Sequence, residues 1–149
     1  MFTIQVATAD ETTEISDLVN RAYTKWIEVI GGKPRPMTAD YNTLIAEQHV
    51  FSAREGTELV GVLVIWHIDD ALYIDNLAVA PSHQGQGIGH KLLNFAEQKV
   101  RELNLNTLTL MTNVKMEYNQ AYYRKYGFTE TRREMMSNGR SVVWMAKQL

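Results

Sequence analysis

The chain has 149 residues, of which 45% are hydrophobic and 21% are charged. This length suits a single domain over residues 1–149 with a buried core, and the composition is ordinary for a globular protein. A formal net charge of −2 argues against a general nucleic-acid binder, and the lack of cysteine excludes disulfides, a thiolate nucleophile and cysteine metal sites.

The sequence favours a cytoplasmic protein with no membrane partner. Residues 1–5 lack the basic and apolar regions of a signal peptide, and no apolar run has the length needed to span a membrane. The absence of cysteine also fits a reducing compartment.

The N-terminal third of the chain predicts a strand followed by two helices. Alternating apolar and polar residues over 2–6 indicate the strand, and Asp10 is a suitable N-cap for a helix that runs to about Val29. The Gly- and Pro-rich segment 31–36 ends this helix, and Thr38 is a suitable N-cap for a short helix to about residue 47.

The remainder predicts three strands, a helix, a strand, a helix and a final hairpin. Gly127 is an expected C-cap of the second of these helices, and Asn138-Gly139 is a strong hairpin signal. The expected elements are strands over 50–54, 59–68 and 72–79, a helix over 88–102, a strand over 107–112, a helix over 119–126, and strands over 128–136 and 140–147.

The run Gln84-Gly85-Gln86-Gly87-Ile88-Gly89 is the most informative feature of the chain. It lies between an apolar strand and a helical pattern, and a glycine-rich turn in that position binds phosphate. Glycines let the backbone approach the ligand, and the first N–H groups of the helix point at it. The glycine spacing fits neither the Rossmann fingerprint nor the P-loop, so we expect a pyrophosphate-bearing ligand of another class.

Read as Gln-x-x-Gly-x-Gly, residues Gln84, Gly87 and Gly89 resemble the acetyl-CoA signature of the GNAT N-acetyltransferase superfamily. The segment 119–128, which ends in Tyr-x-x-x-Gly-Phe, resembles the second hallmark of that family, and the close match covers about residues 59–128. The resemblance implies the GNAT fold, an α/β (α+β) domain in the order β-α-α-β-β-β-α-β-α-β-β. Its single mixed, mostly antiparallel sheet of about seven strands would be flanked by about four helices.

The resemblance also implies an acetyl-CoA-dependent N-acetyltransferase that moves the acetyl group directly to a primary amine. A small-molecule amine is favoured as acceptor because the chain has the family's minimal length. The alternatives are a protein or peptide N-acetyltransferase and a non-catalytic acyl-CoA-binding sensor. No nucleic-acid or membrane partner is expected, and a homodimer remains open.

The cofactor is expected along the glycine-rich turn and the preceding strand. In the family the pantetheine arm pairs with the edge of that strand, here at Leu77 and Val79, and one of these two N–H groups would be the oxyanion donor. Asn119 matches the motif residue that hydrogen-bonds the arm, and it also suits a helix N-cap. The expected cofactor-binding residues are Leu77, Ala78, Val79, Gln84, Gly85, Gln86, Gly87, Ile88, Gly89, His90, Asn119 and Tyr123.

Tyr123 is the expected catalytic acid. It matches the Tyr of the family motif, whose hydroxyl lies near the thioester sulfur, and a phenol can donate a proton at neutral pH. The competing interpretation is a ring that only packs on an amphipathic helix, because Tyr122 and Tyr126 lie on the same helix. No spacing of His and carboxylate residues predicts a metal site.

Asp75 is the expected catalytic base: an acid within an apolar strand is costly to bury and needs a reason, and in the family that the chain resembles a carboxylate on this strand often accepts the proton of the amine or orients the substrate. A structural Asp that hydrogen-bonds its surroundings is the equal alternative, and His67 is another candidate base by its intrinsic pKa. Strand alternation predicts two faces, one with Asp75, Leu77 and Val79 and the other with Ile74, Asn76 and Ala78.

Substrate specificity in the family lies in the first two helices, their connecting loop and the last hairpin. The expected substrate-binding residues are therefore Tyr23, Trp26, Arg35, Met37 and Tyr41, with residues 135–137 of the hairpin. Arg35 lies between two prolines on a stiffened loop and could clamp a carboxylate. An exposed loop arginine is also ordinary, so no amino-acid substrate is inferred from it.

Overall fold

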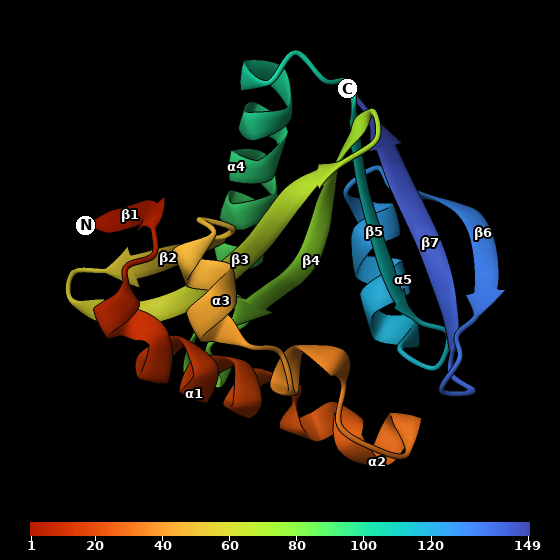
Figure 1. The fold of residues 1–149 in the computed structure, drawn as a ribbon, viewed down its shortest axis with the longest axis horizontal. Helices are drawn as coiled ribbons and strands as arrows, with labels where there is room; N and C mark the ends of the chain where they lie inside the picture. Colours follow the sequence, from red (N-terminus) through yellow and green to blue (C-terminus); the bar gives the residue numbers. More distant parts are fainter.

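The computed structural model describes residues 1–149 as one mixed sheet with helices on both faces (Figure 1). The strands are β1 (Phe2–Val6), β2 (Val50–Glu55), β3 (Glu58–Ile68), β4 (Ala71–Val79), β5 (Thr107–Asn113), β6 (Thr129–Met135) and β7 (Ser141–Gln148). The helices are α1 (Thr12–Tyr23), α2 (Ile27–Ile30), α3 (Tyr41–Ala46), α4 (Ile88–Glu102) and α5 (Glu117–Lys125). The 3-10 turns are η1 (Ala9–Glu11), η2 (Thr24–Trp26), η3 (Arg35–Met37) and η4 (Pro81–His83).

The expected fold class and element order are confirmed by a sheet of 7 strands in the order β1-β2-β3-β4-β5-β7-β6. Every neighbouring pair is antiparallel except β4 and β5. None of the helices combines the length and the apolar character that crossing a membrane requires.

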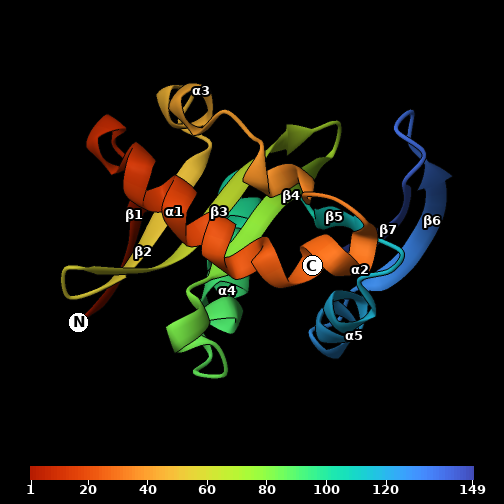
Figure 2. The same cartoon turned by 90° about the horizontal axis from the view of Figure 1, so that it is seen from below.

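The parallel strands β4 and β5 separate after a short stretch of pairing. They pair only from Ala71 with Thr107 to Ile74 with Leu110, although β4 continues to Val79. Figure 1 shows the two strands spreading apart below this point, and Figure 2 shows α1 and α2 crossing in front of them. The separation leaves an unpaired edge on β4, and an unpaired edge presents free backbone N–H and C=O groups.

A β-bulge lies at the point where the strands separate. The register between β3 and β4 leaves Asp75 without a partner on β3. The expected assignment of faces is therefore wrong at Ile74, which lies in the same core as Leu77 and Val79, whereas Ala78 lies in the core on the other face. One extra residue shifts the side-chain alternation of the strand by one position.

Two hydrophobic cores fill the two faces of the sheet. Five apolar positions of α4 are buried against one face, together with Tyr123 and Phe128 from the α5 region, whereas Leu103, which continues the predicted pattern, is 52% exposed. Helices α1 and α3 cover the other face. The buried positions that carry this packing are Ile88, Leu92, Leu93, Ala96 and Val100 on α4, and Ile15, Leu18, Val19 and Ala22 on α1.

The predicted N-terminal helix is divided into four short elements. Asp10 does not cap a continuous helix, because it lies within η1, where the Thr8 N–H donates to the carboxylate of Glu11 at 2.9 Å. The short helix α3 begins after Asp40 rather than Thr38, because the Asp40 carboxylate accepts the N–H group that the helix leaves free.

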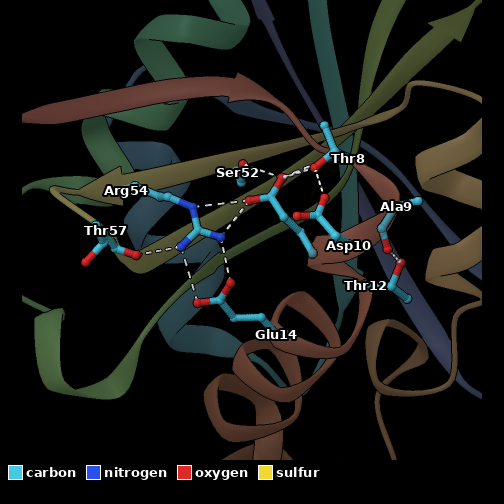
Figure 3. A network of polar contacts seen from close by, with 9 residues as sticks. Thr8, Ala9, Asp10, Thr12, Glu14, Ser52, Arg54 and Thr57 are labelled. Atoms are coloured by element: carbon cyan, nitrogen blue, oxygen red, sulfur yellow. Dashed lines mark hydrogen bonds and ion pairs between the residues drawn. The ribbon is translucent and has the colours of Figure 1, made fainter.

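Arg54 of β2 ties the start of α1 to the sheet (Figure 3). All five of its N–H donors are used, on the carboxylates of Glu11 and Glu14 and on the carbonyl of Thr57, with the shortest N–O distances at 2.6 Å. Burial by itself raises the pKa of Glu11, but the hydrogen bonds from Arg54 and from the Thr8 N–H outweigh it and hold the pKa below its usual value.

Replacing Arg54 with Met should lower the free energy of unfolding by about 1–3 kcal/mol, because Glu11 would lose the partner of a largely buried carboxylate. The matched variant Arg21→Met removes only an exposed pair with Asp17 and should cost less than about 0.5 kcal/mol. Urea unfolding at neutral pH measures both values. Equal losses in the two variants would contradict the importance of this network.

The same network predicts a pH dependence. Because the folded-state pKa of Glu11 is lowered, its contribution to stability is present above its usual value of 4.5 and is lost as the pH falls through the lowered folded value. Urea unfolding across this acid range should show a steeper loss for the unmodified protein than for Arg54→Met. Parallel pH curves for the two proteins would rule this out.

Candidate functional site

Two cavities open along the unpaired edge of β4 and meet each other. The first, the strand cavity, has a volume of about 220 Å³ and lies between β4, β5, η3 and the tip of the β6–β7 hairpin. The second, the turn groove, has a volume of about 350 Å³ and lies between α1, the glycine-rich turn and α5. The residues that line both are Tyr23, Leu77, Asn119 and Tyr123. Ligands bound in the two cavities would therefore meet beside these four side chains.

The glycine-rich turn presents backbone donors to the turn groove. Gly85 and Gly87 both adopt left-handed backbone angles with φ of 83°, and Gly87 is the N-cap of α4. The first helical hydrogen bond runs from Lys91 N–H to the Gly87 carbonyl, so the N–H groups of residues 88–90 precede it and have no helical acceptor. These groups and the positive end of the helix dipole favour an anion at this point.

The side chains of the turn groove add positive charge and aromatic surface. Lys25, His83 and Lys125 line it, and no carboxylate does. The Nζ atom of Lys25 lies 3.4 Å from Gln84 Oε1 and 5.9 Å from the ring centroid of Tyr118. The groove therefore fits a polyanionic ligand such as one that carries a pyrophosphate.

The open edge of β4 borders both cavities. Ala80 donates its N–H to β3, so strand alternation turns the backbone groups of Leu77 and Val79 toward the open edge. Two of these groups already have side-chain partners, since the Leu77 carbonyl accepts from the Tyr23 hydroxyl at 3.4 Å and the Val79 carbonyl accepts from Gln84 Nε2 at 3.2 Å. An extended ligand arm could pair with this edge as an added strand if it replaced Gln84.

The structure brings ten of the twelve expected cofactor residues to the turn groove. Gln86 is exposed at the tip of the turn, and His90 stacks on Tyr126 with ring centroids 4.6 Å apart; neither lines the groove. Asn119 is not an N-cap, because α5 begins at Glu117 with Met116 as its cap. Successive residues at the start of a helix point in different directions, and their spacing in the sequence did not show which of them would line the groove.

Tyr123 lies at the junction of the two cavities and is largely buried. Its ring packs at 5.5 Å from both Tyr122 and Phe128, so the ring also belongs to the core. Burial raises the pKa of Tyr123 well above its usual value, and the neighbouring Tyr122 adds to the rise. The phenol therefore keeps its proton at physiological pH and has the protonation state of an acid.

Asp75 is a buried carboxylate beside an exposed guanidinium. Its side chain is 3% exposed, and it forms an ion pair with Arg35 of η3, whose side chain is 53% exposed. The Arg35 guanidinium contacts Oδ1 of this carboxylate, so Arg35 is its counter-charge in the free protein. A buried carboxylate needs a counter-charge, and because Asp75 lines the strand cavity, a bound cation could replace Arg35 in that role.

A buried chain of hydrogen bonds positions the loop that carries Arg35. The Tyr23 hydroxyl donates to Asn76 Oδ1 at 2.8 Å, Asn76 Nδ2 donates to the Tyr41 oxygen at 3.1 Å, and the Tyr41 hydroxyl donates to the Pro36 carbonyl at 2.6 Å. Burial raises the pKa of both tyrosines, so their hydroxyls stay protonated donors. Asn76 was not among the predicted site residues, and the one signal for it in the sequence is a polar residue within an apolar strand.

The expected substrate residues divide among several places. Tyr23 and Arg35 line the strand cavity and Trp26 lines the turn groove, whereas Met37 and Tyr41 line neither. From the hairpin, residues 136 and 137 line the strand cavity, but Met135 is 74% exposed and does not. The alternative base His67 is exposed at the end of β3 and also lines neither cavity.

Four polar residues that line the strand cavity were not predicted from the sequence as site residues. They come from β4, β5 and the hairpin, which meet only in the folded sheet: Tyr73, Asn113, Asn138 and Arg140. Arg140 donates from Nη1 to the Lys33 carbonyl at 2.9 Å and so joins the hairpin to the loop before η3. Its position directly after the Asn-Gly turn was the available signal.

Gly89 lets α5 pack closely against the start of α4. A Cβ atom at this position would clash with the hydroxyl of Tyr122 and lie 3.3 Å from its Cζ atom. The pKa of Tyr122 is raised to about 12, first by burial and then by neighbouring tyrosines.

Replacing Gly89 with Ala should destabilise the protein by about 1–3 kcal/mol, because Tyr122 must move. In a Tyr122→Phe background the same substitution should be neutral or stabilising by up to about 1 kcal/mol, because the clash is removed and Ala has the higher helix propensity. A double-mutant cycle from urea unfolding tests this. Equal costs of Gly89→Ala in both backgrounds would contradict the packing described.

Comparisons with known proteins point to one family. The family described as the acetyltransferase (GNAT) domain matches residues 22–149. A relative from Bacillus subtilis (strain 168), assigned as a ribosomal protein bS18-alanine N-acetyltransferase, is 29% identical over 96 residues, covering 62% of this chain and 64% of that protein. An aminoalkylphosphonate N-acetyltransferase of Salmonella typhimurium (strain LT2) is 29% identical over 96 residues, covering 60% and 62%. The chain thus matches less than two thirds of the length of these curated relatives.

A solved structure supports the fold over the whole chain. The PaiA N-acetyltransferase from Thermoplasma acidophilum, crystallised in complex with coenzyme A, superimposes with a TM-score of 0.81 at 14% identity. The match covers 100% of this chain and 99% of that one, so the arrangement of strands and helices is shared from end to end.

Proposed function

The chain belongs to the GNAT acetyltransferase family, and from this premise we propose that it is an acetyl-CoA-dependent N-acetyltransferase of small primary amines. One observation carries the proposal: a groove suited to a pyrophosphate and a cavity with a buried carboxylate meet at the protonated Tyr123. Residues 1–149 form one catalytic domain in this proposal.

The turn groove and the edge of β4 bind acetyl-CoA, which supplies the activated acetyl group as a thioester. The N–H groups of the turn and the side chains of Lys25 and Lys125 bind its phosphates. The open edge at Leu77 and Val79 binds its extended arm. One of these two N–H groups donates to the thioester carbonyl oxygen, where negative charge develops during the reaction.

Tyr123 is the general acid. Its phenolic oxygen carries a proton, donates it to the sulfur of the departing thiolate and recovers it from solvent. Burial keeps this proton in place at neutral pH.

Asp75 binds the ammonium group of the acceptor and accepts its proton. It is the only carboxylate that lines the strand cavity, and its counter-charge in the free protein is the half-exposed Arg35. Transfer of the proton to Asp75 leaves a neutral amine that can attack the acetyl carbon, and the nitrogen releases its second proton to solvent as the C–S bond breaks.

The size of the strand cavity favours a small acceptor. Its volume of about 220 Å³ is below the roughly 300–1,000 Å³ typical of sites for drug-sized ligands. The names of the two relatives include a protein acceptor and a small aminoalkylphosphonate, and the cavity favours the second kind.

Tyr123→Phe should lower kcat by about 10²- to 10⁴-fold, because the variant keeps the ring and loses the acid. Free-thiol release from acetyl-CoA measures turnover, and the protein itself contributes no thiol. Acetyl-CoA affinity by calorimetry should stay unchanged, and Tyr122→Phe should lower kcat by less than about tenfold. A Tyr123→Phe enzyme with unchanged kcat at every pH would remove Tyr123 from the mechanism.

Asp75→Asn should lower kcat/KM for the amine by about 10²- to 10³-fold while acetyl-CoA binding is retained. The amide has nearly the same shape but neither attracts an ammonium group nor takes its proton. The pH profile of kcat/KM should become steeper toward high pH, because only amine that is already deprotonated can react. If Asp75 is purely structural, the variant will instead lose thermal stability and keep the kinetics of the original enzyme.

A further inference from the structure

The strand cavity has more positive than negative charge. Its charged lining residues are Asp75, Arg35 and Arg140. Arg35 forms an ion pair only with Asp75, and Arg140 has no carboxylate partner and donates to the backbone carbonyl of Lys33. One carboxylate therefore faces two guanidinium groups.

Binding of an acceptor amine would change the balance of charge in the strand cavity further. Its ammonium group needs the carboxylate of Asp75, which Arg35 contacts in the free protein. When the ammonium takes that position, both guanidinium groups are left without a negative partner. Guanidinium groups without a negative partner favour a ligand anion, which an arginine can bind through two parallel N–H bonds.

We infer that the acceptor of this enzyme is an amine that also carries a carboxylate or phosphonate group, bound by Arg35 and Arg140 while Asp75 holds its ammonium end. The inference rests on the proposed function and names the chemical class of its acceptor. Arg35 acts as the counter-charge of Asp75 in the free enzyme and as an anion-binding residue in the complex.

The loop before and within η3 is held in a way that supports this role. The carbonyl of Pro36 accepts from Tyr41, and the carbonyl of Lys33 accepts from Arg140, so the backbone on both sides of Arg35 is fixed. A Cβ atom at Gly32 would lie 2.8 Å from Arg140 Nη2, which shows how closely the two segments approach. The guanidinium of Arg35 itself remains half exposed and can change partners.

The test compares three amines with the same carbon spacer: β-alanine, 2-aminoethylphosphonate and the neutral β-alaninamide. Thiol release from acetyl-CoA should give kcat/KM values about 10- to 100-fold higher for at least one anionic amine than for the amide. The ratio between the first two compounds distinguishes a carboxylate from a phosphonate. Equal values for all three amines, or a faster reaction with an amidated peptide, would overturn the inference.

Substitution of the two arginines tests whether they cause the preference for an anionic amine. Arg35→Gln and Arg140→Gln should each raise the KM of the preferred anionic amine about 10- to 100-fold and leave the KM of acetyl-CoA unchanged. Lys33→Gln removes a charge from the same loop but keeps the carbonyl that Arg140 uses, and it should behave as the unmodified enzyme. Retention of the preference in both arginine variants would overturn the assignment.

A binding measurement separates this inference from the proposed function. If acetyl-CoA binds and no amine is acetylated, the proposed function fails, but thermal unfolding with CoA and each amine still tests the charge argument. A rise in Tm with an anionic amine that is absent for β-alaninamide and lost in Arg35→Gln would support it. The same Tm with all three amines would overturn it.

Discussion

The separation of β4 from β5 is the constraint on which the rest of the structure depends. Parallel pairing ends at Ile74 and Leu110, and the chain then leaves five residues of β4 with one unpaired edge. In most sheets such an edge is a liability. Here the edge forms a wall of both cavities, and the bulge at Asp75 lies where the separation begins. The separation of the strands thus opens the site, and the bulge places the Asp75 carboxylate in its lining.

The two cavities differ in whether a carboxylate lines them, and the difference matches their proposed ligands. The turn groove combines helix N–H groups with lysines and has no carboxylate, which suits phosphates. The strand cavity combines one buried carboxylate with two arginines, which suits an amine that also carries an anionic group. Tyr123 lies between them, and burial keeps its phenol protonated. The charged groups of the two cavities thus account for the binding of each proposed substrate, and burial of Tyr123 accounts for the proton that it keeps.

The N-terminal segment contributes to the site although it lies mostly outside the family match, which covers residues 22–149. Arg54 connects β2 to the start of α1, and the apolar face of α1 packs on the sheet. This packing places Tyr23, the last residue of α1, against Asn76 and the open edge of β4. A contact network remote from the cavities thus helps to fix a side chain that lines both of them.

The sequence by itself determined the order of elements and the glycine-rich turn at the start of α4, because each follows from residues near one another in the chain. Tertiary structure decided what depends on register and on distant segments. The bulge at Asp75 moved Ile74 to the face opposite the one that alternation predicts, because one unpaired residue has no local signature. The hydrogen bonds of Asn76 and the position of Arg140 arise where elements far apart in sequence meet, so no periodicity could place them.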